Sequence, residues 1–336
     1  MKTFEIENKT IGPGYPTFVA AEIGINHNGS FDRCKKMIKS AFDSGADAVK
    51  IQTIDETQSY SKNSKSYKVF KNKNFNDAQL LKLKRFSKKL GIIFFSTPGD
   101  IKSLKRLIKL KIPIIKISSG LANNYPLIRE IIRRKIPLII STGLSTIDEI
   151  NFLNKFIRSF KFEKIAIMKC TSQYPANPEN LDLNSIDYIQ RKFKLATGYS
   201  DHALGDVPVI VAVARGASII EKHFTLNRSL KGADHHISLE PKEFKEMVQK
   251  IRITERALGK KIFTLRPTVK KNRRFFLRYL SAIQDIKKGD IFNLNNLGFM
   301  RRKNKKIRGL TPKAFFKIEN RKSKFSFKKG QLITKI

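Results

Sequence analysis

The chain has 336 residues, of which 68 are Lys or Arg and 28 are Asp or Glu, so its formal net charge is +40. No stretch is long and apolar enough for a transmembrane helix, and the N-terminal sequence MKTFEIENKTIG lacks the apolar core of a signal peptide. Two distant cysteines, Cys34 and Cys170, form neither a disulfide framework nor a zinc pattern, so we expect a reduced, cytoplasmic protein. The length of the chain suits one large and one small domain.

Short apolar runs alternate with segments of helical periodicity over the first three quarters of the chain. The runs predict strands at 18–25, 46–53, 92–98, 113–119, 137–142, 164–171, 195–201 and 217–225. Capping-box patterns at Asn76 with Gln79 and at Thr146 with Glu149 predict two helix starts, and a last helix is expected from 241 to about 259. Eight such strand–helix units predict an α/β fold, the (β/α)8 TIM barrel. An open doubly wound sheet is the alternative, but no GxGxxG motif follows the first strand.

The pattern changes after residue 259. Residues 260–274 form a basic segment that we interpret as a linker, and short strands and turns follow. The stretches DIKKGDIF and FSFKKGQLI each place a Lys-Lys-Gly turn between apolar residues, as in a degenerate internal repeat. The sequence therefore predicts a barrel domain over 1–259, a linker over 260–274 and a small β-rich domain over 275–336.

The basic residues are spread along predicted helix faces, as in LKLKRFSKKL and LKRLIKLK. No recognised nucleic-acid-binding motif accompanies them. We therefore expect most of this charge to be solvated. Attraction of anionic small molecules is the second interpretation, and nucleic-acid binding is the least favoured one.

Polar residues gather where the predicted strands end, which is where TIM-barrel enzymes place their active sites. They are Glu22, Lys50, Gln52, Thr97, Lys116, Ser118, Ser119, Ser141, Thr171, Ser200, His202, Glu221 and His223. Because every predicted strand contributes, we expect these residues to form one site.

Lys50 and Lys116 interrupt otherwise apolar strands, in AVKIQ and IIKIS, and neither stretch contains an acidic residue. A buried lysine is unfavourable unless its charge is paired. One alternative is that each side chain reaches the rim of the barrel. We expect instead that an anionic ligand with phosphate or carboxylate oxygens supplies the missing charge. Hydroxyl groups that could bind the same anion belong to Thr97, Ser119, Ser141 and Ser200.

His202 and His223 end the seventh and eighth predicted strands, which are neighbours in a barrel. Their imidazoles can therefore converge, and two imidazoles with carboxylate or water ligands suit a divalent ion such as Mn²⁺ or Zn²⁺. The alternative is that each histidine only caps a turn. His235 and His236 follow in a loop near the same end of the barrel and are secondary candidates.

In chain order, the barrel carries the motifs AEIGINHNG, KIQT, FSTP, KISSG, ISTGLS, KCTSQYP, GYSDHALG, EKHFTL and GADHHISLEP. Together they resemble the N-acetylneuraminate (sialic acid) synthase family, which includes legionaminic and pseudaminic acid synthases. The stretch YLSAIQDIKKGDIFNLNNL resembles the C-terminal antifreeze-like (SAF) domain of that family.

The resemblance implies a transferase that condenses phosphoenolpyruvate with an open-chain 2-acylamino-hexose. The sugar would be N-acetylmannosamine or a 2,4-diacetamido analogue, and the products a nine-carbon 2-keto acid and phosphate. The enzyme alternative is another barrel that condenses phosphoenolpyruvate with an aldose to a 3-deoxy keto sugar acid. The non-enzyme alternative is a basic binding protein whose barrel has lost catalytic activity. The presence of Glu22, Lys50, Lys116, His202 and His223 argues against it.

The resemblance also implies roles for single residues. Phosphoenolpyruvate would contact Lys50, Thr97, Lys116, Ser119, Ser141, Ser172 and Ser200. The sugar would contact Gln52, Tyr174, Asp234 and Phe275. His202 and His223 would bind a divalent metal, Mn²⁺ first and Mg²⁺ or Co²⁺ as alternatives, which acts as a Lewis acid on the aldehyde. Glu22 matches the catalytic carboxylate and would handle a proton at the aldehyde oxygen.

Family resemblance further implies a homodimer in which the small domain caps the partner's barrel, with Arg301 as a catalytic arginine supplied in this way. Four positions depart from the family pattern. Leu121 replaces a sugar-binding Glu, Lys169 a common His, Ser172 an Asn, and Arg302 a Pro. We expect the first three to alter the wall of the site, and loss of the Glu favours a less hydroxylated sugar.

Overall fold

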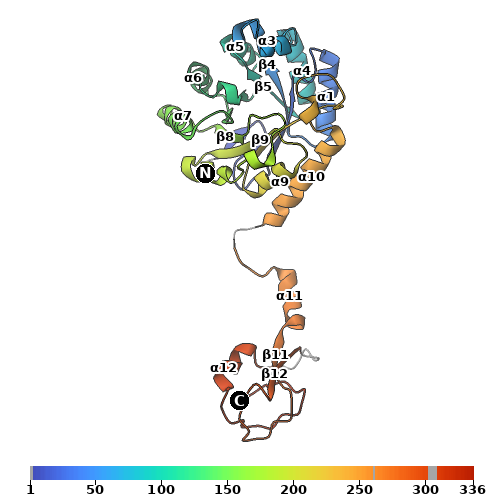
Figure 1. Ribbon diagram of the computed structural model, residues 1–336, viewed down its shortest axis with the longest axis vertical. Coiled ribbons are helices and arrows are strands. Elements are labelled where there is room, and N and C mark those ends of the chain that lie inside the picture. Colours follow the sequence, from blue (N-terminus) through green and yellow to red (C-terminus); the bar gives the residue numbers. More distant parts are fainter. Residues whose placement is uncertain (1–2, 260–261, 302–308) are drawn as a thin grey trace. The chain divides into compact units, whose positions relative to one another are not determined.

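The structure is a computed structural model that describes residues 3–259, 262–301 and 309–336 (Figure 1). The chain divides into two compact units, Met1–Gly259 and Lys260–Ile336. Within the described ranges, no helix combines the length and the apolar character needed to cross a membrane.

The first unit is a closed parallel barrel, and each of the eight predicted strands is confirmed. The strands are β3 (Phe18–Gly24), β4 (Ala48–Thr53), β5 (Ile93–Pro98), β6 (Ile115–Ile117), β7 (Leu138–Ser141), β8 (Ile165–Cys170), β9 (Ala196–Asp201) and β10 (Ile219–His223). They pair in chain order, and β10 closes the barrel by pairing with β3. The TIM-barrel prediction is therefore confirmed.

Helices surround the strands, and all but the apolar α9 (Val207–Ala214) are amphipathic (Figure 1). They are α1 (Phe31–Asp43), α4 (Asp77–Leu90), α5 (Ile101–Lys109), α6 (Tyr125–Arg133), α7 (Ile147–Ser159), α8 (Ser185–Phe193), α9 (Val207–Ala214) and α10 (Pro241–Leu258). Two short helices, α2 (Glu56–Ser59) and α3 (Lys65–Phe70), lie between β4 and α4. Both predicted capping boxes form, with Asn76 at the start of α4 and Thr146 at the start of α7.

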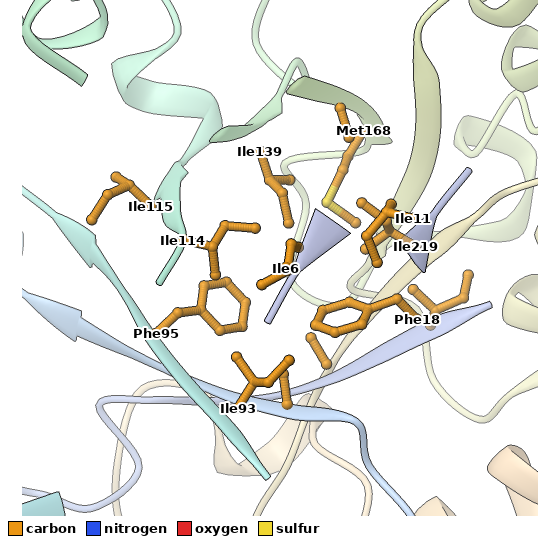
Figure 2. Close-up of a cluster of buried hydrophobic side chains, with 14 of the residues drawn as sticks. Ile6, Ile11, Phe18, Ile93, Phe95, Ile114, Ile115, Ile139, Met168 and Ile219 are labelled. Carbon is orange, nitrogen blue, oxygen red and sulfur yellow. The ribbon is translucent and has the colours of Figure 1, made fainter. Parts of the chain in front are cut away.

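A hairpin that the sequence analysis did not predict precedes the barrel. Strands β1 (Phe4–Ile6) and β2 (Lys9–Ile11) pair antiparallel. Ile6 and Ile11 are buried in one core with the first residues of barrel strands, including Phe18 and Ile219 (Figure 2). Strands of three residues show too little periodicity to be recognised. The hairpin fills the amino-terminal end of the barrel, so the site must lie at the other end.

The second unit has a small apolar core of its own, which includes Leu280, Phe292 and Ile318. Its elements are α11 (Pro267–Phe276), β11 (Arg278–Ala282), β12 (Leu297–Arg301) and α12 (Phe315–Ile318), and β11 pairs antiparallel with β12. Most of α11 lies in the segment that we interpreted as a linker. It begins with Pro267, whose fixed φ suits the first helical position.

The internal repeat of the second unit is a structural one. Gly289 and Gly330 end the two Lys-Lys-Gly stretches with φ of 97° and 81°, a backbone conformation that favours glycine. A bridge between Ile286 and Phe327 pairs the residues that precede the two turns. The two stretches are therefore equivalent turns in one small core.

Candidate active site

The polar residues predicted from strand ends meet at the carboxyl end of the barrel. Nine of them are at most 6% exposed, namely Glu22, Lys50, Thr97, Lys116, Ser141, Ser200, His202, Glu221 and His223. Gln52 and Ser119 are partly buried. Buried polar groups in such number are unfavourable for folding unless they are paired, so their pairing decides what the site can bind.

Four buried charges form a continuous chain across the barrel. Lys50 Nζ lies 3.0 Å from Glu22 Oε2 and 3.4 Å from Glu221 Oε2. Lys116 Nζ lies 3.0 Å from Glu221 Oε1. The expectation that no carboxylate partners the buried lysines is therefore wrong. The partners come from other strands than the lysines: Glu22 from β3, which neighbours β4, and Glu221 from β10, which lies opposite β6 in the closed barrel.

These charges shift one another's pKa values in opposite directions. Burial raises the pKa of Glu22 to about 7, which Lys50 opposes and Glu221 reinforces. Burial acts the same way on Glu221, but Lys116 and Lys50 outweigh it and hold its pKa well below the usual range. Burial favours a neutral Lys50, yet Glu22 and Glu221 raise its pKa overall. For Lys116, burial prevails over Glu221 and lowers the pKa. Glu22 is therefore the member of the chain poised to exchange a proton near neutral pH.

Hydroxyl groups surround the two lysines. Lys50 Nζ donates to Thr97 Oγ1 at 3.3 Å, and Ser200 Oγ donates to Glu221 Oε1 at 2.9 Å. Ser141 Oγ is buried and makes no hydrogen bond within the described residues. A buried hydroxyl without a partner is unfavourable, so Ser141 is suited to a ligand oxygen.

Gly143 leaves space between two further hydroxyls. A Cβ atom at this position would lie 2.7 Å from Ser172 Oγ and 3.0 Å from Ser119 Oγ. The backbone N–H of Gly143 donates to Ser119 Oγ at 3.0 Å. Ser119 and Ser172 therefore flank a space that only glycine keeps open.

The two predicted metal ligands are neighbours. The rings of His202 and His223 have centroids 5.4 Å apart, and Tyr174 stacks on His202 at 4.1 Å. His202 Nδ1 lies 2.7 Å from the Thr171 carbonyl oxygen, which leaves Nε2 available as a ligand. His223 Nδ1 is buried without a hydrogen-bond partner in the described part of the chain. Burial and the nearby His202 lower the pKa of His223 well below its usual value, so its imidazole is neutral.

This donor set fits a divalent ion with open coordination positions. Neutral imidazole nitrogen is a common ligand of such ions. Among the described residues, no group of three or more His, Cys, Asp or Glu side chains is placed to hold a metal. The chain would therefore supply the two imidazoles, and water or substrate would supply the remaining ligands.

The predicted sugar-contacting residues adjoin Glu22. Gln52 Nε2 donates to Glu22 Oε1 at 3.2 Å. Gly24, with φ of 55°, lies close to the carboxylates of both Glu22 and Asp234. A Cβ atom at this position would be 3.1 Å from Glu22 Oε1 and 3.5 Å from Asp234 Oδ2. Burial raises the pKa of Asp234. Tyr174 is half-exposed at the mouth of the site.

Comparison with known proteins agrees with this geometry. Residues 37–263 match the NeuB family. The chain is 36% identical to N,N'-diacetyllegionaminic acid synthase of Campylobacter jejuni, over 84% of this chain and 89% of that protein. It is 34% identical to pseudaminic acid synthase of the same species, over 94% of this chain and 95% of that protein. The chain belongs to the NeuB family.

A solved structure of a NeuB-type enzyme gives the same result for the fold. The N-acetylneuraminic acid synthetase of Leptospira borgpetersenii, crystallised with citrate, superposes with a TM-score of 0.78 and 31% identity. The match covers 82% of this chain and 96% of that one. The family resemblance inferred from the motifs is therefore confirmed.

Two residues of this NeuB barrel make contacts in the site that the sequence did not predict. Glu221 is expected there only as one of the polar strand ends, yet it links the two lysines. Cys170 Sγ lies 3.8 Å from His202 Nδ1. Conversely, His235 lies against Thr225, with Nδ1 2.7 Å from its hydroxyl, and this contact holds it in the loop.

The departures from the NeuB pattern have different structural settings. Leu121 is partly buried against the barrel core in a short 3-10 helix, Ser119–Leu121. Lys169 pairs in register with Tyr199, and strand alternation turns it away from the barrel interior. The expectation that Lys169 alters the wall of the site is therefore wrong. Arg302 lies outside the described residues.

Phe275 and Arg301 belong to the second unit. Phe275 lies in α11, and Arg301 is the last residue of β12. The Arg301 guanidinium lies over the Phe276 ring at 5.2 Å from its centroid. The proposed contact of these residues with a partner's barrel stays a prediction.

Proposed function

We propose that this NeuB-family chain condenses phosphoenolpyruvate with an open-chain 2-acylamino-hexose, N-acetylmannosamine or a 2,4-diacetamido analogue, to a nine-carbon 2-keto acid and phosphate. The observation that carries the proposal is the buried chain of Glu22, Lys50, Glu221 and Lys116 beside two imidazoles. The names of the relatives, legionaminic and pseudaminic acid synthases, support the same class of product.

Phosphoenolpyruvate would bind at the two lysines. Its phosphate and carboxylate oxygens would compete with Glu221 for Lys50 and Lys116. Hydroxyl groups that would donate to these oxygens belong to Thr97, Ser119, Ser141, Ser172 and Ser200. With both lysines charged, these four groups carry a net charge of about +1 when Glu22 is protonated and about 0 when it is ionised, so anion binding favours the protonated form.

Carbon–carbon bond formation needs a proton at the sugar. The methylene carbon of phosphoenolpyruvate attacks the aldehyde carbon, the aldehyde oxygen takes up a proton, and addition of water then releases phosphate. Glu22, with a pKa of about 7, suits the donor of that proton. A divalent cation at His202 and His223, Mn²⁺ in the first place, would supply Lewis-acid polarisation of the aldehyde.

The sugar would lie between Gln52, Asp234 and Tyr174, next to Glu22. Phe275 and Arg301 would come from the partner subunit of a homodimer with exchanged SAF-like domains. An arginine in this position would stabilise negative charge that develops on the reacting groups.

The test is phosphate release from phosphoenolpyruvate in the presence of Mn²⁺. The acceptors are N-acetylmannosamine, a 2,4-diacetamido hexose and a 6-deoxy hexose, with unacylated phosphorylated aldoses as the comparison. We expect release that depends on an acylamino-hexose and is lost in Glu22→Gln. Release only with the phosphorylated aldoses would support the alternative enzyme class, and no release with any acceptor would contradict both.

A further inference from the structure

A second buried ion pair lies directly behind the two imidazoles. Lys222 Nζ is 2.6 Å from Asp201 Oδ2, and both side chains are completely buried. Asp201 immediately precedes His202, and Lys222 immediately precedes His223. Strand alternation therefore places the ion pair on the outer face of the barrel wall and the imidazoles on the inner face.

The Asp201–Lys222 pair lies at the last position where β9 and β10 are paired, directly before the two histidines. Ser200 pairs with Glu221, and Asp201 pairs with Lys222, at which point the paired backbone of these two strands ends. His202 and His223 follow one residue later. His223 still pairs with Glu22 of β3, but no backbone pairing joins His202 to His223. The Asp201–Lys222 pair is the side-chain contact at the last position where β9 and β10 are paired.

Further hydrogen bonds extend this contact to both sides of His202. Asp201 Oδ1 accepts from the Tyr199 hydroxyl at 2.8 Å and from the Ala203 N–H at 3.0 Å. Lys222 Nζ also donates to the Ala203 carbonyl oxygen. The residues before and after His202 are thus tied to the residue before His223.

We propose that Asp201 and Lys222 are positioning residues that hold His202 and His223 at the separation needed to bind a divalent metal. The inference rests on the metal-binding role in the proposed function. A buried ion pair is weak evidence for stability, because proteins in which apolar residues replace such a pair are often equally stable. A short charge-assisted hydrogen bond does, however, fix the relative position of the two side chains. Supporting residues behind metal ligands commonly change metal affinity by about 10- to 100-fold.

The test measures Mn²⁺ binding by calorimetry and the visible spectrum of the Co²⁺ form. Asp201→Asn combined with Lys222→Met removes both charges together and keeps an acceptor for Tyr199 and Ala203. The matched control is Asp47→Asn with Arg252→Met, which removes an ion pair of 3.1 Å next to the amino-terminal end of β4. We expect about 10-fold weaker Mn²⁺ binding and an altered Co²⁺ spectrum in the first variant, and neither change in the control.

The possible outcomes separate this inference from the proposed function. Wild-type protein that binds no Mn²⁺ would overturn the metal site and the positioning role together. Wild-type binding with unchanged affinity in the folded double variant would overturn the positioning role alone. If the double variant does not fold, the isosteric Asp201→Asn variant decides: weaker Mn²⁺ binding supports the role, and wild-type affinity contradicts it.

Discussion

Lys116 Nζ lies 3.0 Å from Glu221 Oε1, although the two residues come from β6 and β10 on opposite sides of the barrel. Glu221 also contacts Lys50 and accepts a hydrogen bond from Ser200. An anionic substrate must therefore displace or share a carboxylate that already occupies the cations. This relationship changes what is expected of substitutions at the lysines.

Lys116→Met should abolish phosphoenolpyruvate binding and also destabilise the barrel. We expect a loss of about 2 kcal/mol in the free energy of unfolding, below the ~3–5 kcal/mol typical of an orphaned buried charge, because Lys50 and Ser200 still contact Glu221. Urea denaturation and calorimetric titration measure the two effects. Adding Glu221→Gln should restore stability but not binding. A Lys116→Met variant as stable as wild type would show that the ion pair is energetically unimportant.

Phosphoenolpyruvate binding should take up a proton at Glu22. The folded pKa of about 7 lies above the ordinary 4.5, and an incoming anion raises it further, so binding weakens as pH rises through 7. Calorimetry at pH 7.5 in buffers of different ionisation enthalpy, a pH chosen about half a unit above that pKa, measures the uptake. Glu22→Gln should bind phosphoenolpyruvate without this proton uptake, and its affinity should not fall as pH rises through 7. Equal proton uptake in the variant would assign the titration to another group.

Much of this arrangement follows from local sequence signals. The apolar periodicity predicts β3 to β10, and the capping boxes at Asn76 and Thr146 predict helix starts, because both signals depend on neighbours in the chain. The hairpin β1–β2 escapes detection because three-residue strands are stabilised by the barrel core rather than by their own pattern. The partnership of Glu221 with Lys116 depends on closure of the barrel, which brings residues 105 positions apart together.

Gly143→Ala should weaken phosphoenolpyruvate binding with little effect on folding. The added Cβ would lie 2.7 Å from Ser172 Oγ and 3.0 Å from Ser119 Oγ, so both hydroxyls must move. We expect the KM for phosphoenolpyruvate to rise about 10-fold, which corresponds to a loss of about 1.4 kcal/mol in binding free energy as the hydroxyls move. Gly120→Ala is the matched control, because nothing lies within 4 Å of a Cβ at that position. A normal KM in Gly143→Ala, or an equal rise in both variants, would remove this space from the substrate site.

Arg301→Ala and Glu22→Ala should complement each other if the small domains are exchanged between subunits. Each homodimer would be inactive, whereas a hybrid holds one barrel with its own Glu22 and the partner's intact Arg301. Random assortment makes half of the dimers hybrids with one working site of two, so about a quarter of wild-type activity should return. Co-expressed Glu22→Ala and Glu22→Gln serve as the control without complementation. Purified hybrids without activity would show that Arg301 does not act across the dimer.

The central claim is that a carbon–carbon bond forms between phosphoenolpyruvate and an acylamino-hexose. The most direct measurement uses phosphoenolpyruvate labelled with carbon-13 at its methylene carbon and the hexose labelled at its aldehyde carbon. We predict a nine-carbon product whose two labelled carbons show one-bond coupling by nuclear magnetic resonance, with one phosphate released per product. Phosphate release that leaves the labels in separate molecules, pyruvate and unchanged hexose, would contradict the account.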